Sequence, residues 1–152
     1  MRKRTRSREF ALQLLYQIDL SGGSAEEIYE DFWKKRADST FSKEEKKAVE
    51  QSKKNGDIRQ YADRLVRGTV EHLAAIDKRI EKFTENWEMK RMAYVDRNIL
   101  RLATFEILYL EDIPVKVAIN EAVELAKRYG ETDSSKFVNG ILDRIAKMEC
   151  EK

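Results

Sequence analysis

The sequence predicts an all-α fold. Apolar residues recur at helical spacing along most of the 152 residues, and runs that alternate as a half-buried strand would are almost absent. One proline and six glycines leave few points at which a helix would be broken. With 41% apolar residues, the chain can bury a core. We therefore expect about seven helices in a compact bundle that forms a single domain over residues 1–152.

The first helix is expected over about residues 5–20. The sequence Ser21-Gly22-Gly23 ends it, since glycine tolerates the left-handed backbone that follows a helix. Ser24 and Glu27 have the spacing of a capping box, which predicts that a second helix starts there. That helix is expected to bury Ile28, Phe32 and Trp33.

Residues 34–56 differ from the rest of the chain. They are almost all charged or small, with Phe41 and Val49 as isolated apolar residues. We interpret them as a charged surface insertion that is partly helical and adds little to the core. Asn55-Gly56 then forms a turn, and Asp57 is placed to cap the next helix.

The second half of the chain is predicted to hold the remaining helices. An amphipathic helix follows Asp57, and a shorter helix comes after it. The most hydrophobic segment, at about 94–110, is apolar on more than one side, which is typical of a central helix. Pro114 suits the first turn of the helix after it, because proline lacks only an N–H that the first turn leaves unpaired.

The last helix is expected to begin after Gly130, which stops the preceding one. Thr132 or Asp133 is its predicted cap. Gly140 lies inside this helix, where glycine costs about 1 kcal/mol relative to alanine. We expect a neighbouring backbone to pass close to it.

The charge of the chain is concentrated near its start. Lys and Arg exceed Asp and Glu by only two, so the field of the whole protein is weak and an anionic partner needs a local patch. Such a patch precedes Glu9, the first acidic residue. We call it the basic segment, and it contains Arg2, Lys3, Arg4, Arg6 and Arg8. Clusters of this kind often bind nucleic acid, and the alternative is a solvated tail.

The sequence offers no reactive constellation. His72 is the only histidine, and one imidazole makes neither a catalytic triad nor a zinc site. Cys150 is the only cysteine, which excludes an internal disulfide and favours a reducing cytoplasm. No signal peptide is expected after Met1, and no apolar run approaches the roughly 18 residues of a membrane span. We expect no catalytic residue, no metal and no cofactor.

Aromatic residues near basic ones suggest where an unpaired base would stack. Tyr16 follows the basic segment at helical spacing, and Phe137 stands beside Lys136 early in the last helix. The alternative for both rings is a place in the core. On these residues alone, DNA and RNA both remain open as ligands.

Several motifs resemble the NusB family of bacterial transcription antitermination factors over nearly the whole chain. The first helix contains R-x-R-x-x-A-L-Q-L-L-Y from Arg6, and the central helix begins D-R-N-I-L-R-L-A at Asp96. The most specific motifs are P-V-K-V-A-I-N-E-A-V-E-L-A-K from Pro114 and K-F-V-N-G-I-L-D from Lys136. The segment at 34–56 is longer and more charged than expected of the family.

The resemblance implies a fold of two three-helix subdomains with an additional N-terminal helix. It also implies binding to the single-stranded boxA element of ribosomal RNA leader transcripts. A small-subunit ribosomal protein, the factor NusE, is the implied protein partner. Together they modify RNA polymerase so that it reads through terminators, and no catalytic activity is implied.

The resemblance further implies site residues. RNA is expected to lie across the first helix and the start of the last one. The implied RNA contacts are Arg2, Lys3, Arg4, Arg6, Arg8, Tyr16, Lys136 and Phe137. The implied partner contacts are Asp96, Phe105 and Lys116.

Three other functions are alternatives on the sequence alone. One is a protein-interaction scaffold whose basic segment is incidental. A second is a DNA-binding helix-turn-helix module, but no helix shows an evident base-reading face. A third is the RNA-binding domain of a ribosomal RNA cytosine methyltransferase, which needs a large catalytic domain beyond a chain of 152 residues.

Overall fold

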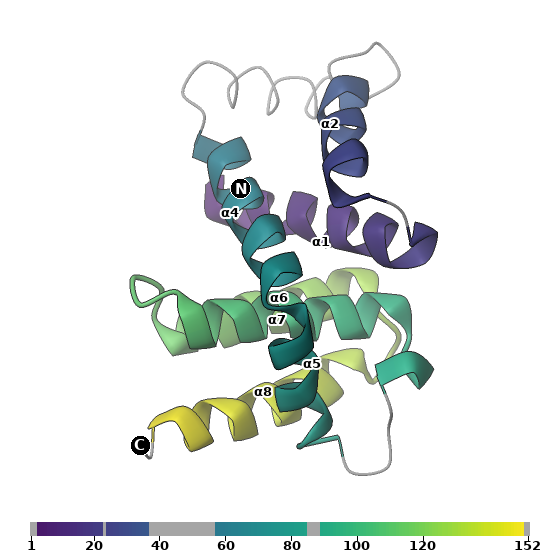
Figure 1. The fold of residues 1–152 in the computed structure, drawn as a ribbon. Helices are drawn as coiled ribbons and strands as arrows, with labels where there is room; N and C mark the ends of the chain where they lie inside the picture. Colours follow the sequence, from purple (N-terminus) through teal and green to yellow (C-terminus); the bar gives the residue numbers. More distant parts are fainter. Residues whose placement is uncertain (1–2, 23, 37–56, 85–88, 151–152) are drawn as a thin grey trace. The chain divides into compact units, whose positions relative to one another are not determined.

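The computed structural model describes residues 3–22, 24–36, 57–84 and 89–150. Across these ranges it contains seven α-helices, one 3-10 helix and no strand (Figure 1). The all-α prediction is thereby confirmed. The chain divides into two compact units, residues 1–67 (unit 1) and 68–152 (unit 2).

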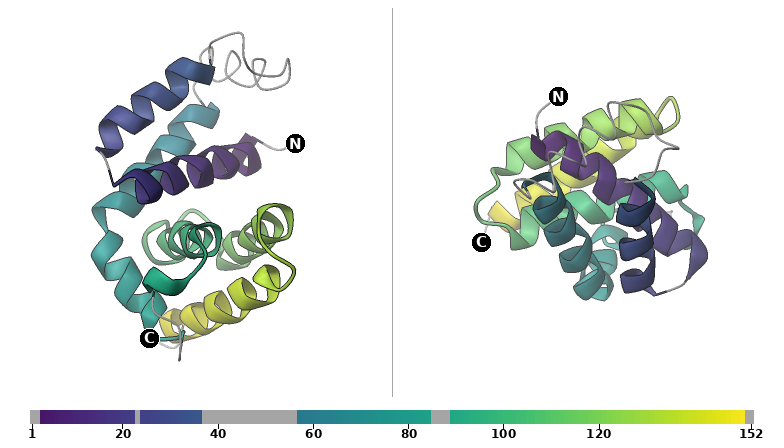
Figure 2. Two further views of the ribbon diagram at one scale, coloured as in Figure 1. Left: turned by 90° about the vertical axis from the view of Figure 1, so that its right-hand side faces the viewer. Right: turned by 90° about the horizontal axis from the view of Figure 1, so that it is seen from above.

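Unit 1 holds α1 (Lys3–Ser21), α2 (Ala25–Arg36) and most of α4 (Asp57–Glu71). Its core contains an aromatic cluster in which α2 packs on α1 (Figure 2). The ring of Phe10 meets Phe32 and Trp33 edge to face, with centroids 5.9 Å and 5.3 Å apart. Ser7 ties α4 to α1, since its Oγ donates a 2.8 Å hydrogen bond to the carbonyl of Ile58. The predicted burial of Phe32 and Trp33 is confirmed, whereas Ile28 is only half-buried.

The turn between α1 and α2 confirms the predicted role of glycine. Gly22 has φ of +66°, which residues with a Cβ rarely adopt. Its N–H donates to the carbonyl of Ile18 at 3.0 Å and so closes the last turn of α1. α2 then extends to Arg36. The first three residues of the predicted insertion are therefore helical, while residues 37–56 lie outside the described part of the chain.

Unit 2 is built around α6 (Tyr94–Tyr109), which contacts three other helices. These are α5 (Leu73–Glu81), α7 (Val115–Tyr129) and α8 (Ser134–Cys150), and the short helix η1 (Met89–Arg91) precedes α6. Ile99 and Leu100 of α6 are fully buried. The central position that the hydrophobic sequence predicted for this helix is confirmed within unit 2.

The ends of α7 follow the predicted signals closely. Pro114 occupies the N-cap with φ of −59°, one position before the first turn, and its carbonyl accepts the N–H of Ala118 at 3.1 Å. Gly130 ends the helix. A Cβ there would lie 2.6 Å from the Cβ of Ser134, so the close start of α8 requires glycine.

The expectation for Gly140 is wrong. A Cβ on this residue would meet nothing within 4 Å, and the residue is exposed. Within the described part of the chain, no backbone passes close to it. The cost of a glycine inside α8 therefore has no packing explanation.

Candidate RNA-binding site

From Lys3 onward the basic segment is helical and not a tail, because α1 begins there. Lys3 and Arg4 are exposed, whereas Arg8 is only 2% exposed. Arg4 and Arg8 lie one turn apart, so both face the ring of Tyr61 on α4. Their guanidinium carbons lie 4.6 Å and 5.5 Å from its centroid, and Arg8 Nη2 donates to the Tyr61 hydroxyl at 3.5 Å. The segment therefore divides into an exposed start and a buried continuation.

Arg6 belongs to the packed part of the segment. Its guanidinium lies 4.4 Å from the centroid of the Phe10 ring and pairs with the buried carboxylate of Glu9 at 3.2 Å. An ion pair to a buried carboxylate leaves an uncompensated charge when one partner is removed. Arg6 and Arg8 therefore stabilise unit 1 itself. Arg2 lies outside the described residues, and Tyr16 is half-buried.

A cavity of about 390 Å³ opens where α1 and α4 both begin. We call it the α1–α4 cavity. It is lined by Lys3, Arg4, Asp57, Gln60, Tyr61 and Arg64. Its α4 residues were missed by the sequence reasoning, although the spacing 57, 60, 61 and 64 marks one face of a helix.

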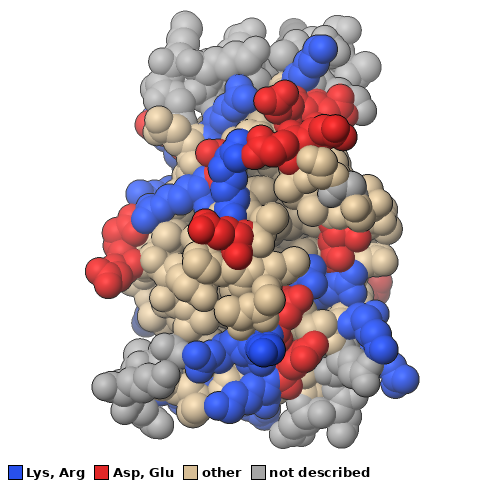
Figure 3. Space-filling model, in the orientation of Figure 1, with Lys and Arg blue, Asp and Glu red and all other residues tan. Residues whose placement is uncertain are grey.

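Another face of α4 meets α2, and there the arginines of α4 contact acidic and aromatic side chains. Arg59 lies 5.3 Å from the centroid of the Trp33 ring, and Arg67 pairs with both Glu26 and Asp63. Burial, assisted by Asp63, raises the pKa of Tyr29 to about 12, so this phenol stays neutral well above physiological pH. In Figure 3 acidic side chains lie over α2 and basic ones over α4.

A second cavity, of about 580 Å³, lies at the start of α8 in unit 2. We call it the α8 cavity. It is lined by Arg91, Met92, Ala93, Asp96, Glu131, Thr132, Asp133, Ser134 and Phe137. The structure thus brings together Phe137, a predicted RNA contact, and Asp96, a predicted partner contact. Lys136 is exposed beside them but does not line the cavity.

The α8 cavity has one unusual polar atom. Asp96 Oδ1 is buried and accepts no hydrogen bond from any described residue. Buried polar atoms in folded proteins are nearly always paired, and an unpaired one marks a place where a ligand or water completes the structure. Because Asp96 lines the cavity, a ligand or water held there is the candidate partner for this carboxylate.

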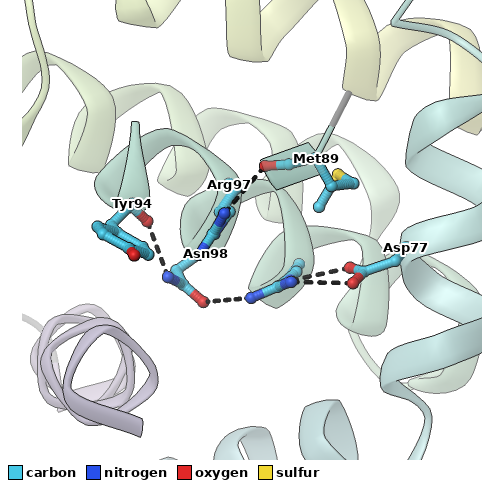
Figure 4. A network of polar contacts seen from close by, with 6 residues as sticks. Asp77, Met89, Tyr94, Arg97 and Asn98 are labelled. Atoms are coloured by element: carbon cyan, nitrogen blue, oxygen red, sulfur yellow. Dashed lines mark hydrogen bonds and ion pairs between the residues drawn. The ribbon is translucent and has the colours of Figure 1, made fainter. Parts of the chain in front are cut away.

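The cavity wall is held by a polar network on α6, which Figure 4 shows. Arg97 Nη1 donates to the Met89 carbonyl at 3.0 Å, and its guanidinium lies 4.2 Å from the centroid of the Tyr94 ring. Arg101 bonds both carboxylate oxygens of Asp77 at 2.8 Å and 2.9 Å. These bonds fix η1 and α5 against α6. Arg91 and Met92, at the end of η1, are thereby positioned beside Asp96.

Two predicted partner contacts differ in accessibility. Lys116 is exposed at the start of α7, whereas Phe105 is 4% exposed within the core. A Cβ on Gly68 would lie 2.0 Å from Cζ of Phe105, so the tip of the ring packs against the backbone of α4. His72, the single histidine, stacks on Tyr109 with centroids 4.1 Å apart. Phe105 therefore belongs to the core beneath α6 and not to its exposed surface.

Among the described residues, no group of three or more His, Cys, Asp or Glu side chains could hold a metal ion. None of the described helices combines the length and the apolar character that crossing a membrane requires.

Comparisons with known proteins agree with the resemblance. The model of the NusB family matches residues 5–147. Transcription antitermination protein NusB of Thermodesulfovibrio yellowstonii is 41% identical, over 97% of this chain and 93% of the relative. The NusB protein of Anaeromyxobacter dehalogenans is 46% identical, over 95% and 90%.

Solved structures give the same result. NusB of T. maritima superposes with a TM-score of 0.73 at 43% identity, covering 95% of this chain and 90% of that one. A structure of antitermination factors NusB and NusE in complex with double-stranded RNA has a TM-score of 0.76 at 31% identity. It covers 97% of this chain and 98% of that one.

Proposed function

Because this chain belongs to the NusB family of transcription antitermination factors, we propose that it binds boxA RNA together with NusE. The RNA is the single-stranded boxA element of ribosomal RNA leader transcripts. The assembly acts on RNA polymerase in the cytoplasm, and the protein contributes binding without catalysis. The related NusB–NusE structure with double-stranded RNA supports both the nucleic acid and the protein partner.

The observation that carries the RNA proposal is the exposed, helical start of α1. Lys3 and Arg4 stand on a fixed backbone, with Arg4 seated over Tyr61. Arginine and lysine at such a position suit phosphate oxygens, whose neutralisation releases counterions. This part of the interaction is independent of sequence and sensitive to salt.

Selection of the sequence is assigned to the start of α8. Single-stranded RNA exposes its bases to stacking and to contacts at their edges. Phe137 is half-buried at the rim of the α8 cavity, so part of its ring is available to a base, and Lys136 is exposed beside it for a phosphate. Asp96 and Lys116 are the proposed contacts with NusE, with Phe105 supporting α6 from the core.

The test measures binding of a short fluorescent boxA RNA, a scrambled RNA of equal composition and the boxA sequence as duplex DNA, each with and without NusE. We expect modest affinity for boxA RNA alone, tighter binding with NusE, and preference over both controls. Absence of RNA affinity in every mixture would contradict the proposal and favour a protein-interaction scaffold. Preference for duplex DNA over RNA would contradict it in favour of a DNA-binding module.

A further inference from the structure

The face of α4 that lines the α1–α4 cavity carries groups that the RNA assignments above do not use. Gln60 and Arg64 lie one turn apart on this face, with Tyr61 between them and α1 beyond. Gln60 and Arg64 are both exposed. The cavity therefore has two walls, and only the α1 wall belongs to the basic segment.

The charges of this cavity favour an anion. Three cations, Lys3, Arg4 and Arg64, line it together with one carboxylate, Asp57. Lys3 pairs with Asp57 at 3.0 Å, but both side chains are about half exposed. Exposed ion pairs of this kind contribute little to stability, so a phosphate can replace the carboxylate at small cost. The amino ends of α1 and α4 add positive potential at the same place.

Tyr61 organises the cavity. It is 6% exposed, and its ring holds the guanidinium of Arg4 on the cavity side. The N–H donors of a guanidinium lie in its own plane, so an arginine resting over an aromatic ring can still bind phosphate oxygens bidentately. The arginine is thus oriented before any ligand arrives.

We propose that α4 forms the second half of the phosphate-binding site, in which Arg64 and Gln60 bind an RNA phosphodiester together with Lys3 and Arg4. Arg64 supplies charge and paired donors, Gln60 supplies an amide donor, and Tyr61 is a positioning residue. The ligand is the backbone of single-stranded RNA. This inference depends on the proposed RNA-binding function and adds to it a helix outside the basic segment.

The test compares Arg64→Gln with Arg59→Gln, two substitutions that remove the same charge from the same helix. Arg59 lies against Trp33 in a cavity with Glu27, Glu30 and Asp31, so it serves as the matched control. For single strands, each phosphate contact contributes roughly 0.7 to the slope of log affinity against log salt. We expect Arg64→Gln to reduce the slope by about 0.7 and Arg59→Gln to leave it unchanged. Raising the salt from 50 to 200 mM weakens binding, and this loss of affinity should be about 2.6-fold smaller for Arg64→Gln than for the unaltered protein.

The possible results distinguish failure of the α4 assignment from failure of the proposed RNA-binding function. If the unaltered protein binds no RNA, the proposed function fails. If it binds RNA and Arg64→Gln has the unaltered slope, or both variants change equally, only the α4 assignment is overturned. Arg64→Lys serves as a second variant that keeps the charge, and it should restore the slope while binding more weakly than arginine. Melting temperatures within a degree of the unaltered protein verify that each variant is folded.

Discussion

The α1–α4 cavity of unit 1 and the α8 cavity of unit 2 differ in charge. The first is lined by three cations and one carboxylate. The second is lined by one cation, Arg91, and three carboxylates, with Phe137 as its aromatic ring. Both contain residues that the family resemblance implies for RNA, yet only one has the charge that attracts phosphates.

We propose that the two units contribute differently to binding on the basis of this difference. A cationic cavity binds any RNA backbone, and its affinity depends on salt. An acidic cavity repels phosphates and suits neutral or donor groups such as base edges and the backbone or side-chain N–H groups of a protein. We therefore assign affinity to unit 1 and selectivity, for RNA sequence and for NusE, to unit 2.

The largest expected effect in unit 2 comes from Asp96→Ala, which removes both carboxylate oxygens. The carboxylate of Asp96 has a buried oxygen that no described residue pairs, and hydrogen bonds to charged groups contribute about 1.5–3 kcal/mol. Affinity for NusE should fall by about that amount, while affinity for RNA alone should not decrease. Isothermal titration with NusE measures this. Asp143→Ala, which removes an exposed carboxylate paired with Lys147 on α8, is the control and should have no effect.

A comparable or smaller effect is expected from Phe137→Ala. Stacking of a base on an aromatic side chain contributes roughly 1–3 kcal/mol. The variant should lose preference for boxA RNA over the scrambled RNA and keep its salt dependence. Competition between the two RNAs measures the preference. A changed salt slope with unchanged preference would reverse the assignment of roles to the two cavities.

The smallest effect is expected from Gly140→Ala, one turn after Phe137. A Cβ at this position meets no atom, and alanine in a helix is favoured over glycine by about 0.5–1 kcal/mol. We expect the free energy of unfolding to rise by that amount in a denaturant titration, with RNA binding unchanged. A loss of RNA affinity would instead extend the RNA-binding surface along α8 beyond the cavity.

The helices could be predicted from the sequence because their signals are local. Gly22, Pro114 and Gly130 act through their own backbone geometry, so their places at helix ends agree with prediction. The hydrophobic pattern of α6 likewise marked it as central to its unit. Residues 37–56 lie outside the described chain, and the prediction of a charged insertion there stays a prediction.

The site was harder to predict because it depends on which partner each side chain meets. Counting charges near the start of the chain did not separate Lys3 from Arg8, which is buried against Tyr61. Phe105 is held in the core by Gly68, 37 positions earlier in the sequence, and no local pattern shows that contact. Gln60 and Arg64 do share a helical face, but only the folded structure places this face beside the start of α1, where both line a cavity.

The helical start of the basic segment has a thermodynamic consequence. A disordered basic tail loses conformational entropy when it binds, and this loss subtracts from its affinity. Here α1 begins at Lys3, and Arg4 already rests on Tyr61 in the free protein. The conformational entropy lost on binding at this site therefore comes chiefly from the transcript. The entropy of binding measured by calorimetry should vary with RNA flexibility more than with changes in the protein.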